Sequence, residues 1–272
     1  MLKTRIVTAL ILLAVLLPIL YFSILPALLA VSALFLAAAI WECGRLFRLS
    51  RPTLLALIWC AVFALLVLQT GIDKISLLYS LCVAIWLIRL TPALKLGLPA
   101  LESLGNRLLN GVYSISILGC FVAVVALFKV SSLYLLSVLA IVWIADIGAY
   151  FTGRAFGKRK LAPTISPGKS WEGVIGGWVA VIVVAVVCSM LWHNMDIFST
   201  RLAVAWGWLG MMIVLTIVVA ASIIGDLFES QLKRRVGMKD SSNLLPGHGG
   251  VLDRIDSLIP VLPLAVLVGS WL

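Results

Sequence analysis

Residues 173–192 read GVIGGWVAVIVVAVVCSMLW, a run that contains no charged side chain. Its length matches the roughly 20 apolar residues that an α-helix needs to cross a bilayer. Similar apolar runs recur from Ile6 to Leu272, so the pattern belongs to the whole chain and not to a single anchor. A helix satisfies its backbone polar groups internally, as lipid requires. The sequence therefore predicts an all-α, polytopic transmembrane helix bundle.

The composition excludes other classes of protein. Of the 272 residues, 63% are hydrophobic and 12% are charged, whereas globular domains contain about 45–50% apolar and about 25% charged residues. A soluble globule, a disordered chain and a disulfide-stapled secreted domain are therefore excluded. An outer-membrane barrel would alternate apolar and polar residues over about 10 positions, and this chain does not.

We expect about nine membrane spans with the N-terminus in the cytoplasm and the C-terminus outside. The predicted spans are residues 6–22, 25–41, 54–69, 75–89, 111–128, 133–150, 172–192, 203–223 and 256–271. In this orientation all but three of the 21 Lys and Arg residues face the cytoplasm, the exceptions being Lys74, Lys129 and Arg201. This asymmetry is what the positive-inside rule requires. The net charge of +10 therefore indicates membrane orientation and not a nucleic-acid partner. We expect the chain to lie in a bacterial cytoplasmic membrane.

Polar residues divide the chain into two parts. Residues 1–110 place almost no polar side chain inside a span, which favours a scaffold or a dimer surface. Residues 111–272 carry Asp146, Asp226 and Glu229 within or at the ends of apolar helices. A carboxylate at the middle of a membrane helix costs roughly 2.5–3.5 kcal/mol, so it needs a partner or a water-filled cavity. We therefore expect the active site in the second part.

Two groups of acidic residues flank a cationic loop near the C-terminus. Asp226, Glu229, Ser230 and Lys233 share one face if the segment is helical. Asp253 and Asp256 begin the final helix, and residues 233–250 between the groups read KRRVGMKDSSNLLPGHGG. Carboxylate oxygens suit Mg²⁺, and the cations suit phosphate. His248 is expected to donate a hydrogen bond to phosphate, with a general-acid role or a loop hydrogen bond as alternatives.

A second inner loop, residues 153–173, reads GRAFGKRKLAPTISPGKSWEG. Ser166 and Pro167 fit the N-cap and first position of the next helix, which would place Lys169 in its first turn. A helix N-terminus with a lysine binds anions readily. A nucleotide-binding P-loop is excluded because its first glycine would fall at Pro163.

At this point the sequence resembles a known family. The run SQLKRRVGMKDSSNLLPGHGGVLDRID, residues 230–256, is similar to the signature of the phosphatidate cytidylyltransferases, also called CDP-diacylglycerol synthases. Residues 143–158 (WIADIGAYFTGRAFGK), 165–173 (ISPGKSWEG) and 225–230 (GDLFES) resemble further blocks of that family in the same order. The resemblance covers the chain from about residue 140 onward.

The resemblance implies an activity, cofactors and site residues. Such an enzyme transfers a cytidylyl group from CTP to phosphatidate, giving CDP-diacylglycerol and pyrophosphate for phospholipid biosynthesis. It requires Mg²⁺, with a second cation such as K⁺, and is expected to be a homodimer. Asp226 and Asp253 would be the metal ligands. The phosphates would be surrounded by Lys233, Arg234, Lys239, His248 and Arg254, and the remaining substrate-binding residues would be Asp146, Ser166, Lys169, Ser230 and Asp256.

Other functions fit the sequence less well. A CDP-alcohol phosphotransferase would carry a D-G-x-x-A-R core, which is absent. An ion-coupled transporter or flippase of an anionic lipid would also use intramembrane carboxylates. Such a protein would show inverted repeats and broken helices in both halves, and no internal repeat is visible. A lipid-binding scaffold would leave the ordered Asp, Lys and Gly pattern unexplained.

Overall fold

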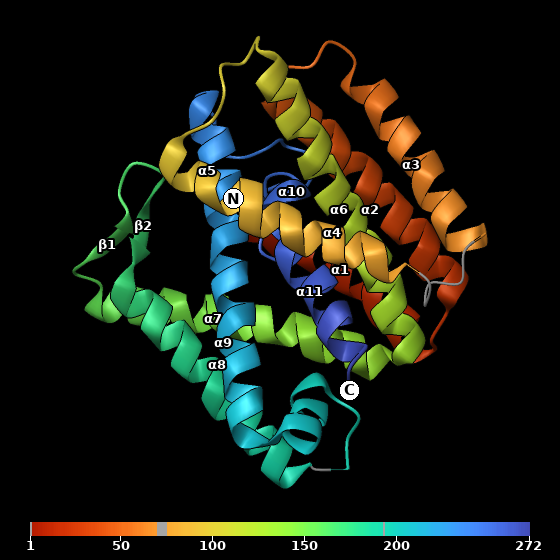
Figure 1. Ribbon diagram of the computed structural model, residues 1–272, viewed down its shortest axis with the longest axis vertical. Helices are drawn as coiled ribbons and strands as arrows, with labels where there is room; N and C mark the ends of the chain where they lie inside the picture. The colour runs from red at the N-terminus through yellow and green to blue at the C-terminus, as the bar shows by residue number, and fades with distance from the viewer. Residues whose placement is uncertain (1, 70–74, 193) are drawn as a thin grey trace.

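The computed structural model describes residues 2–69, 75–192 and 194–272, and these form a helical bundle (Figure 1). Its helices are α1 (Leu2–Tyr21), α2 (Leu25–Leu46), α3 (Pro52–Gln69), α4 (Ser76–Ile85), the π-helical turn η2 (Trp86–Leu90), α5 (Thr91–Leu96), α6 (Leu104–Val130), α7 (Ser132–Phe156), α8 (Trp171–Leu191), α9 (Phe198–Arg235), α10 (Leu252–Ile255) and α11 (Leu258–Gly269). Asp73 and Lys74, expected in an outer loop, lie outside the described residues.

Each of the predicted spans coincides with helical structure, so the all-α prediction is confirmed. Within the described residues six helices are long and apolar enough to cross a membrane, counting α4 to α5 as one continuous segment from Ser76 to Leu96. Two apolar helices, Ile6–Tyr21 and Pro52–Leu68, are shorter, and α11 has 12 residues. The chain is an integral membrane protein with several apolar helices.

The centre of the bundle is α6, which packs against α2, α4, α7 and α11. Its Tyr113 is fully buried and meets Trp86 of η2 and Phe228 of α9, with ring centroids 6.2 and 5.0 Å away. Edge-to-face aromatic pairs contribute about 0.5–1.5 kcal/mol each beyond the area that they bury. This aromatic cluster fixes α9 against the core, and α9 carries four of the twelve predicted site residues: Asp226, Ser230, Lys233 and Arg234.

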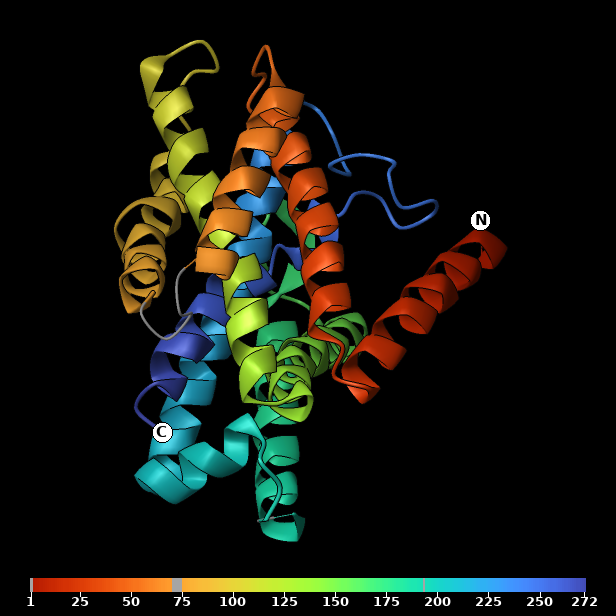
Figure 2. The same ribbon diagram turned by 90° about the vertical axis from the view of Figure 1, so that its right-hand side faces the viewer.

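Small residues let α7 and α8 approach closely. A Cβ added at Gly177 of α8 would lie 2.4 Å from the carbonyl oxygen of Ala145 in α7, and one added at Gly148 would lie 3.0 Å from the Cα of Gly177. Packing through small residues is the usual way in which membrane helices associate. In α9 the backbone leaves the helical conformation at Gly207 (φ 69°), and the short segment before it turns sharply away (Figure 2).

A two-stranded antiparallel sheet, β1 (Lys160–Ala162) and β2 (Ser166–Ser170), corrects one prediction. Ser166 is not a helix N-cap, and Lys169 lies in a strand rather than in the first turn of a helix. The cap of α8 is Ser170, whose Oγ accepts a hydrogen bond from the backbone N–H of Gly173 at 3.2 Å. Ser166 and Ser170 are both of the residue type that favours an N-cap, so the sequence alone does not distinguish them. The pairing with β1 extends the backbone through Lys169 and moves the helix start to Trp171.

Candidate active site

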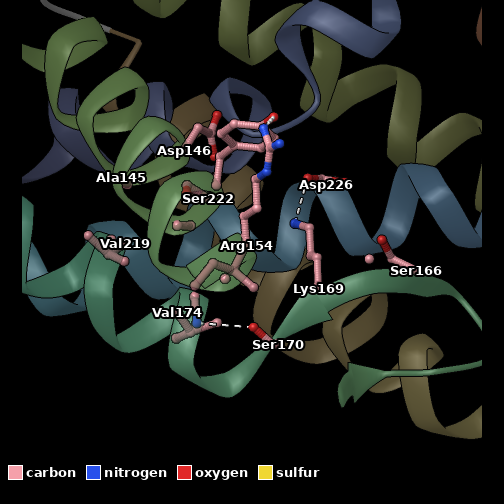
Figure 3. A pocket seen from close by; sticks show the side chains of 17 residues that line it. Ala145, Asp146, Arg154, Ser166, Lys169, Ser170, Val174, Val219, Ser222 and Asp226 are labelled. Carbon is pink, nitrogen blue, oxygen red and sulfur yellow. Dashed lines mark hydrogen bonds and ion pairs between the residues drawn. The ribbon is translucent and has the colours of Figure 1, made fainter. Parts of the chain in front are cut away.

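A cavity of about 490 Å³ lies between α7, α8, α9 and the β hairpin (Figure 3). Its polar lining consists of Asp146, Tyr150, Arg154, Ser166, Lys169, Ser170, Ser222 and Asp226. Glycines of α7 and α8, including Gly153 and Gly177, form part of its wall. Small residues on both helices therefore leave room for the cavity beside the side chains of Asp146, Tyr150 and Arg154.

The cavity is crossed by an ion pair between two distant segments. Lys169 of β2 reaches Asp226 of α9, with Nζ 2.5 Å from Oδ2 (Figure 3). Their side chains remain 25% and 28% exposed, so both are accessible from the cavity. Ser230, one turn further along α9, donates a hydrogen bond to the other oxygen of Asp226 at 3.2 Å. The site thus places a cation, a carboxylate and a hydroxyl together.

Arg154 is a second cation in this cavity, and sequence reasoning assigned it only to membrane orientation. Its guanidinium donates to the hydroxyl of Tyr150 at 3.2 Å, one turn earlier in α7. Asp146 lies on the same helix and lines the same cavity. The spacing of these three residues, i, i+4 and i+8, was a signal that could have found Arg154.

A second ion-pair cluster lies further along α9. Lys233 donates to Oδ1 of Asp253 at 2.6 Å and forms an ion pair with Glu229, which is fully buried. The contacts of Ser230 with Asp226 and of Lys233 with Glu229 confirm that the predicted helix face exists. A buried cation between two carboxylates is satisfied electrostatically, whereas a lone buried charge would be costly.

Asp253 organises the loop before α10. Its Oδ2 accepts hydrogen bonds from the N–H and the hydroxyl of Ser241, each at 2.9 Å, and from the N–H of Gly250 at 2.8 Å. Burial opposes ionisation of this carboxyl, but the Lys233 hydrogen bond and these backbone donors outweigh it, so the pKa of Asp253 lies below its usual value. Gly249 has a φ of +83°, and a Cβ there would lie 2.8 Å from Oδ2.

Two arginines of the signature, Arg234 and Arg254, make backbone contacts outside the cavity. Arg234 donates to the carbonyl oxygen of Ile165 at 3.3 Å, which connects α9 to the hairpin. Arg254 donates through Nε to the carbonyl oxygen of His248 at 2.9 Å. The buried Nδ1 of His248 has no hydrogen-bond partner in the part of the chain that the structure describes. Lys239 is exposed on the loop.

The twelve predicted site residues therefore separate into two groups. Asp146, Ser166, Lys169 and Asp226 line the cavity. The other eight are outside the lining of the cavity: Ser230, Lys233, Arg234, Lys239, His248, Asp253, Arg254 and Asp256. Of these, Asp256 interacts electrostatically with Asp226 and Lys233, and it accepts a hydrogen bond from the N–H of Ser257 at 2.7 Å. All eight lie on the next turns of α9 and in the loop and helix that follow.

Glu42 of α2 was missed by sequence reasoning. It is fully buried, and its oxygens accept hydrogen bonds from the hydroxyl of Ser242 (2.5 Å) and from the N–H groups of Val251 (3.0 Å) and Leu252 (2.6 Å). The one hydroxyl proton of Ser241 is shared between Glu42 (3.1 Å) and Asp253 (2.9 Å). The predicted span ended at residue 41, whereas α2 continues to Leu46, so Glu42 fell outside the predicted helix and was not considered. It fixes the signature loop and the start of α10 to the N-terminal helices.

Of the two predicted metal ligands, Asp226 is better placed to bind a metal ion than Asp253. Among the described residues no group of three or more His, Cys, Asp or Glu side chains has the arrangement of a metal site. Asp226 lines the cavity and is part-exposed, so its carboxylate fits Mg²⁺, which is usually bound by one or two carboxylates together with substrate phosphates. Both oxygens of Asp253 already accept hydrogen bonds, so it would have to release Lys233 or a loop donor to bind a metal.

The protein has long apolar helices and a cavity lined by carboxylates, a lysine and an arginine. These features define the class: an integral membrane protein with a site suited to a phosphate-bearing substrate. Comparison with known proteins narrows that class. The sequence profile of the Cytidylyltransferase family matches residues 3–272. The chain therefore belongs to the phosphatidate cytidylyltransferase family, as the resemblance predicted.

The relatives show how far the similarity extends. The phosphatidate cytidylyltransferase of Haemophilus influenzae is 38% identical over 288 aligned positions, which cover 97% of this chain and 96% of the relative. The proteins of the same name from Pseudomonas aeruginosa and Staphylococcus saprophyticus are 51% and 43% identical over 140 and 132 positions, 50% and 48% of this chain and 48% and 46% of their own length. Similarity thus spans the N-terminal helices as well as the signature.

Proposed function

We propose that this protein transfers a cytidylyl group from CTP to phosphatidate, releasing pyrophosphate and forming CDP-diacylglycerol. One observation carries this proposal, the similarity to a phosphatidate cytidylyltransferase over 97% of the chain. The cavity that contains Lys169, Asp226 and Arg154 supports it, because the cations can neutralise phosphate while the carboxylate suits a divalent metal.

The reaction fits a site that lacks a prominent protein nucleophile. An oxygen of the phosphatidate phosphate attacks the α-phosphorus of CTP, and the bond to the departing pyrophosphate breaks. A phosphomonoester has a second pKa of about 6, so it is already largely ionised at pH 7. The protein must therefore align the two phosphates and neutralise their charge. Lys169 and Arg154 would do this in the cavity, and Lys233 and His248 would contribute from the segment that runs from the end of α9 into the signature loop.

We further propose that Mg²⁺ binds at Asp226, with Asp253 as the second protein ligand and a second cation such as K⁺ nearby. A divalent ion there would neutralise charge on the phosphates. Lys169 and Lys233, which neutralise these two carboxylates, would then be available to phosphate oxygens. Asp253→Asn should lower turnover most at limiting Mg²⁺, which a titration of initial rate against Mg²⁺ measures. Full activity of this variant at limiting Mg²⁺ would remove Asp253 from the metal site.

We propose nine crossings of a bacterial cytoplasmic membrane, with the N-terminus and the cavity on the cytoplasmic side and the C-terminus outside. The distribution of Lys and Arg supports this orientation, and CTP is available on that side. Phosphatidate would enter sideways from the inner leaflet. Labelling of single cysteines in loop 236–250 by a membrane-impermeant reagent tests the orientation, and labelling from outside intact cells would contradict it.

We propose that residues 1–110 support residues 111–272, which hold the active site, and that the protein is a homodimer. The contacts of Glu42 with the signature loop support the first part of this proposal. The dimer rests on the resemblance to the family. Its test is the mass of the purified protein in detergent.

The activity is tested with purified protein in detergent, CTP, phosphatidate and Mg²⁺, with pyrophosphate release as the readout. We expect release that requires both substrates. An ion-coupled transporter or flippase would instead move lipid without consuming CTP. Absence of turnover by the wild-type protein, with lipid movement in vesicles, would replace the transferase proposal by that alternative.

A further inference from the structure

A groove distinct from the catalytic cavity lies where the turn between α2 and α3 meets the start of α6. It has a volume of about 1240 Å³. We call it the arginine groove and define it by six of its lining residues: Phe47, Arg48, Arg51, Leu54, Ile58 and Arg107. Figure 1 shows the α2–α3 turn and the loop before α6 at the same end of the molecule, the end at which α9 finishes.

The groove collects positive charge that the protein itself does not neutralise. Arg48, Arg51 and Arg107 are exposed, and within the described residues none of their guanidinium groups has a salt bridge or hydrogen bond. Glu102 is the one acidic residue in the described lining. Arg48 also lies close enough to Arg235 of α9 for mutual repulsion. An anion in the groove would relieve this repulsion.

Local backbone conformation favours glycine where the chain carries Arg48. The N–H of Leu49 donates to the carbonyl oxygen of Gly44, and the N–H of Arg48 to that of Arg45, each at 2.9 Å. These two bonds form a Schellman motif at the end of α2. Arg48 occupies its left-handed position with a φ of +53°, where glycine is the usual residue. Arg48 therefore destabilises the fold locally, and its side chain makes no hydrogen bond or salt bridge within the described chain that would offset this.

The other wall of the groove is apolar. Leu54 and Ile58, one turn apart on α3, are 48% and 52% exposed and continue the groove from the arginines along the helix. Cations at one end and an exposed aliphatic wall at the other complement an anionic headgroup and an acyl chain. We propose that the arginine groove binds an anionic phospholipid of the cytoplasmic leaflet, with its phosphate at the arginines and one acyl chain along α3.

The assignment of the lipid to the cytoplasmic leaflet rests on the orientation given under the proposed function. The binding of an anionic phospholipid to the groove does not depend on that orientation. Anionic lipids attract cationic segments on the cytoplasmic side of a membrane. The groove shares no lining residue with the catalytic cavity. Binding can therefore be measured without CTP, so its failure and the failure of the proposed activity are separate results.

The test is native mass spectrometry of the full chain in detergent, titrated with phosphatidylglycerol or with phosphatidylcholine of the same acyl chains. We expect the first phosphatidylglycerol to bind at least tenfold more tightly than phosphatidylcholine. The triple variant Arg48→Gln, Arg51→Gln, Arg107→Gln should lose at least tenfold in phosphatidylglycerol affinity. The control variant Lys158→Gln, Arg159→Gln, Lys160→Gln removes the same charge outside the groove and should change that affinity by less than twofold.

Arg48→Gly separates binding from folding. It removes one cation and supplies the residue that the left-handed position favours, so it should weaken phosphatidylglycerol binding about fivefold without lowering the melting temperature. Equal affinity of the wild type for both lipids, or wild-type affinity in the triple variant, would overturn the proposal. So would a second copy of the chain in the groove, seen as dimerisation that the triple variant abolishes while lipid affinity stays unchanged.

Discussion

At the residue scale, the site consists of lysines that pair with carboxylates, Lys169 with Asp226 and Lys233 with Asp253. The sequence predicted all four residues on different grounds: Asp226 as a charge in an apolar helix that needs a partner, and Lys169, Lys233 and Asp253 from the two cationic loops and the family resemblance. Their roles in catalysis stay predictions. Which lysine meets which carboxylate could not be predicted, since Lys169 comes from a hairpin that the apolar pattern does not encode. Glu42 follows the same rule and was missed only through a span boundary that was set too early.

Lys169→Gln should lower kcat/KM by about 10²-fold or more, because it removes a positioned cation from the cavity. It also leaves the carboxylate of Asp226 without its partner. Initial-rate measurements over a range of CTP concentrations check this. Lys160→Gln, a change in the exposed neighbouring strand β1, serves as the matched control. Equal losses in the two variants would show that Lys169 acts only through general charge.

Glu42→Gln should lower the melting temperature and the turnover together. An amide NH₂ cannot accept hydrogen bonds, so it would face either the donors Ser242 and Val251 or the donors Ser241 and Leu252. A buried donor without an acceptor costs about 1–3 kcal/mol. Thermal unfolding in detergent measures the effect. Glu102→Gln changes an exposed acid of the same half and should leave the melting temperature unaltered, and an equal drop there would contradict the proposed anchoring by Glu42.

At the scale of elements, apolar runs predicted the helices well and their connections poorly. The strands β1 and β2 were not foreseen because Lys160–Ala162 and Ser166–Ser170 are short and part-exposed, without the alternation that marks a buried strand. The close approach of α7 and α8 was also not apparent, although their glycines permit it. Both features place Lys169 opposite α9, so the cavity depends on elements that hydropathy does not reveal.

The packing of α7 on α8 gives a matched pair of substitutions. Gly177→Ala should destabilise the protein, because its Cβ would lie 2.4 Å from the backbone oxygen of Ala145. Gly111→Ala, in the interior of α6, meets no atom within 4 Å and should stabilise slightly, by about 0.5–1 kcal/mol, because glycine is a poor helix former. Melting temperatures that shift in the same direction would show that this close contact does not control the packing.

At the scale of the whole molecule, the two parts of the chain meet at the signature loop. Residues 111–272 supply the cavity, while α2 holds the loop through Glu42 and α1 reaches it through Thr8, whose hydroxyl donates to the carbonyl oxygen of Pro246 at 2.8 Å. The composition predicted an apolar bundle, and the charge asymmetry predicted a side for the site. Neither could predict that the N-terminal helices anchor the loop, because that contact joins residues about 200 positions apart.

The most direct test of the central claim is pyrophosphate release by wild-type protein and by Asp226→Asn, each with CTP, phosphatidate and Mg²⁺. Asp196→Asn, a change at an exposed acid outside the cavity, serves as the control. We predict release by the wild type and by the control, and a loss of about 10²-fold or more in Asp226→Asn. Wild-type rates in Asp226→Asn, or no CTP-dependent release by the wild type, would contradict the account.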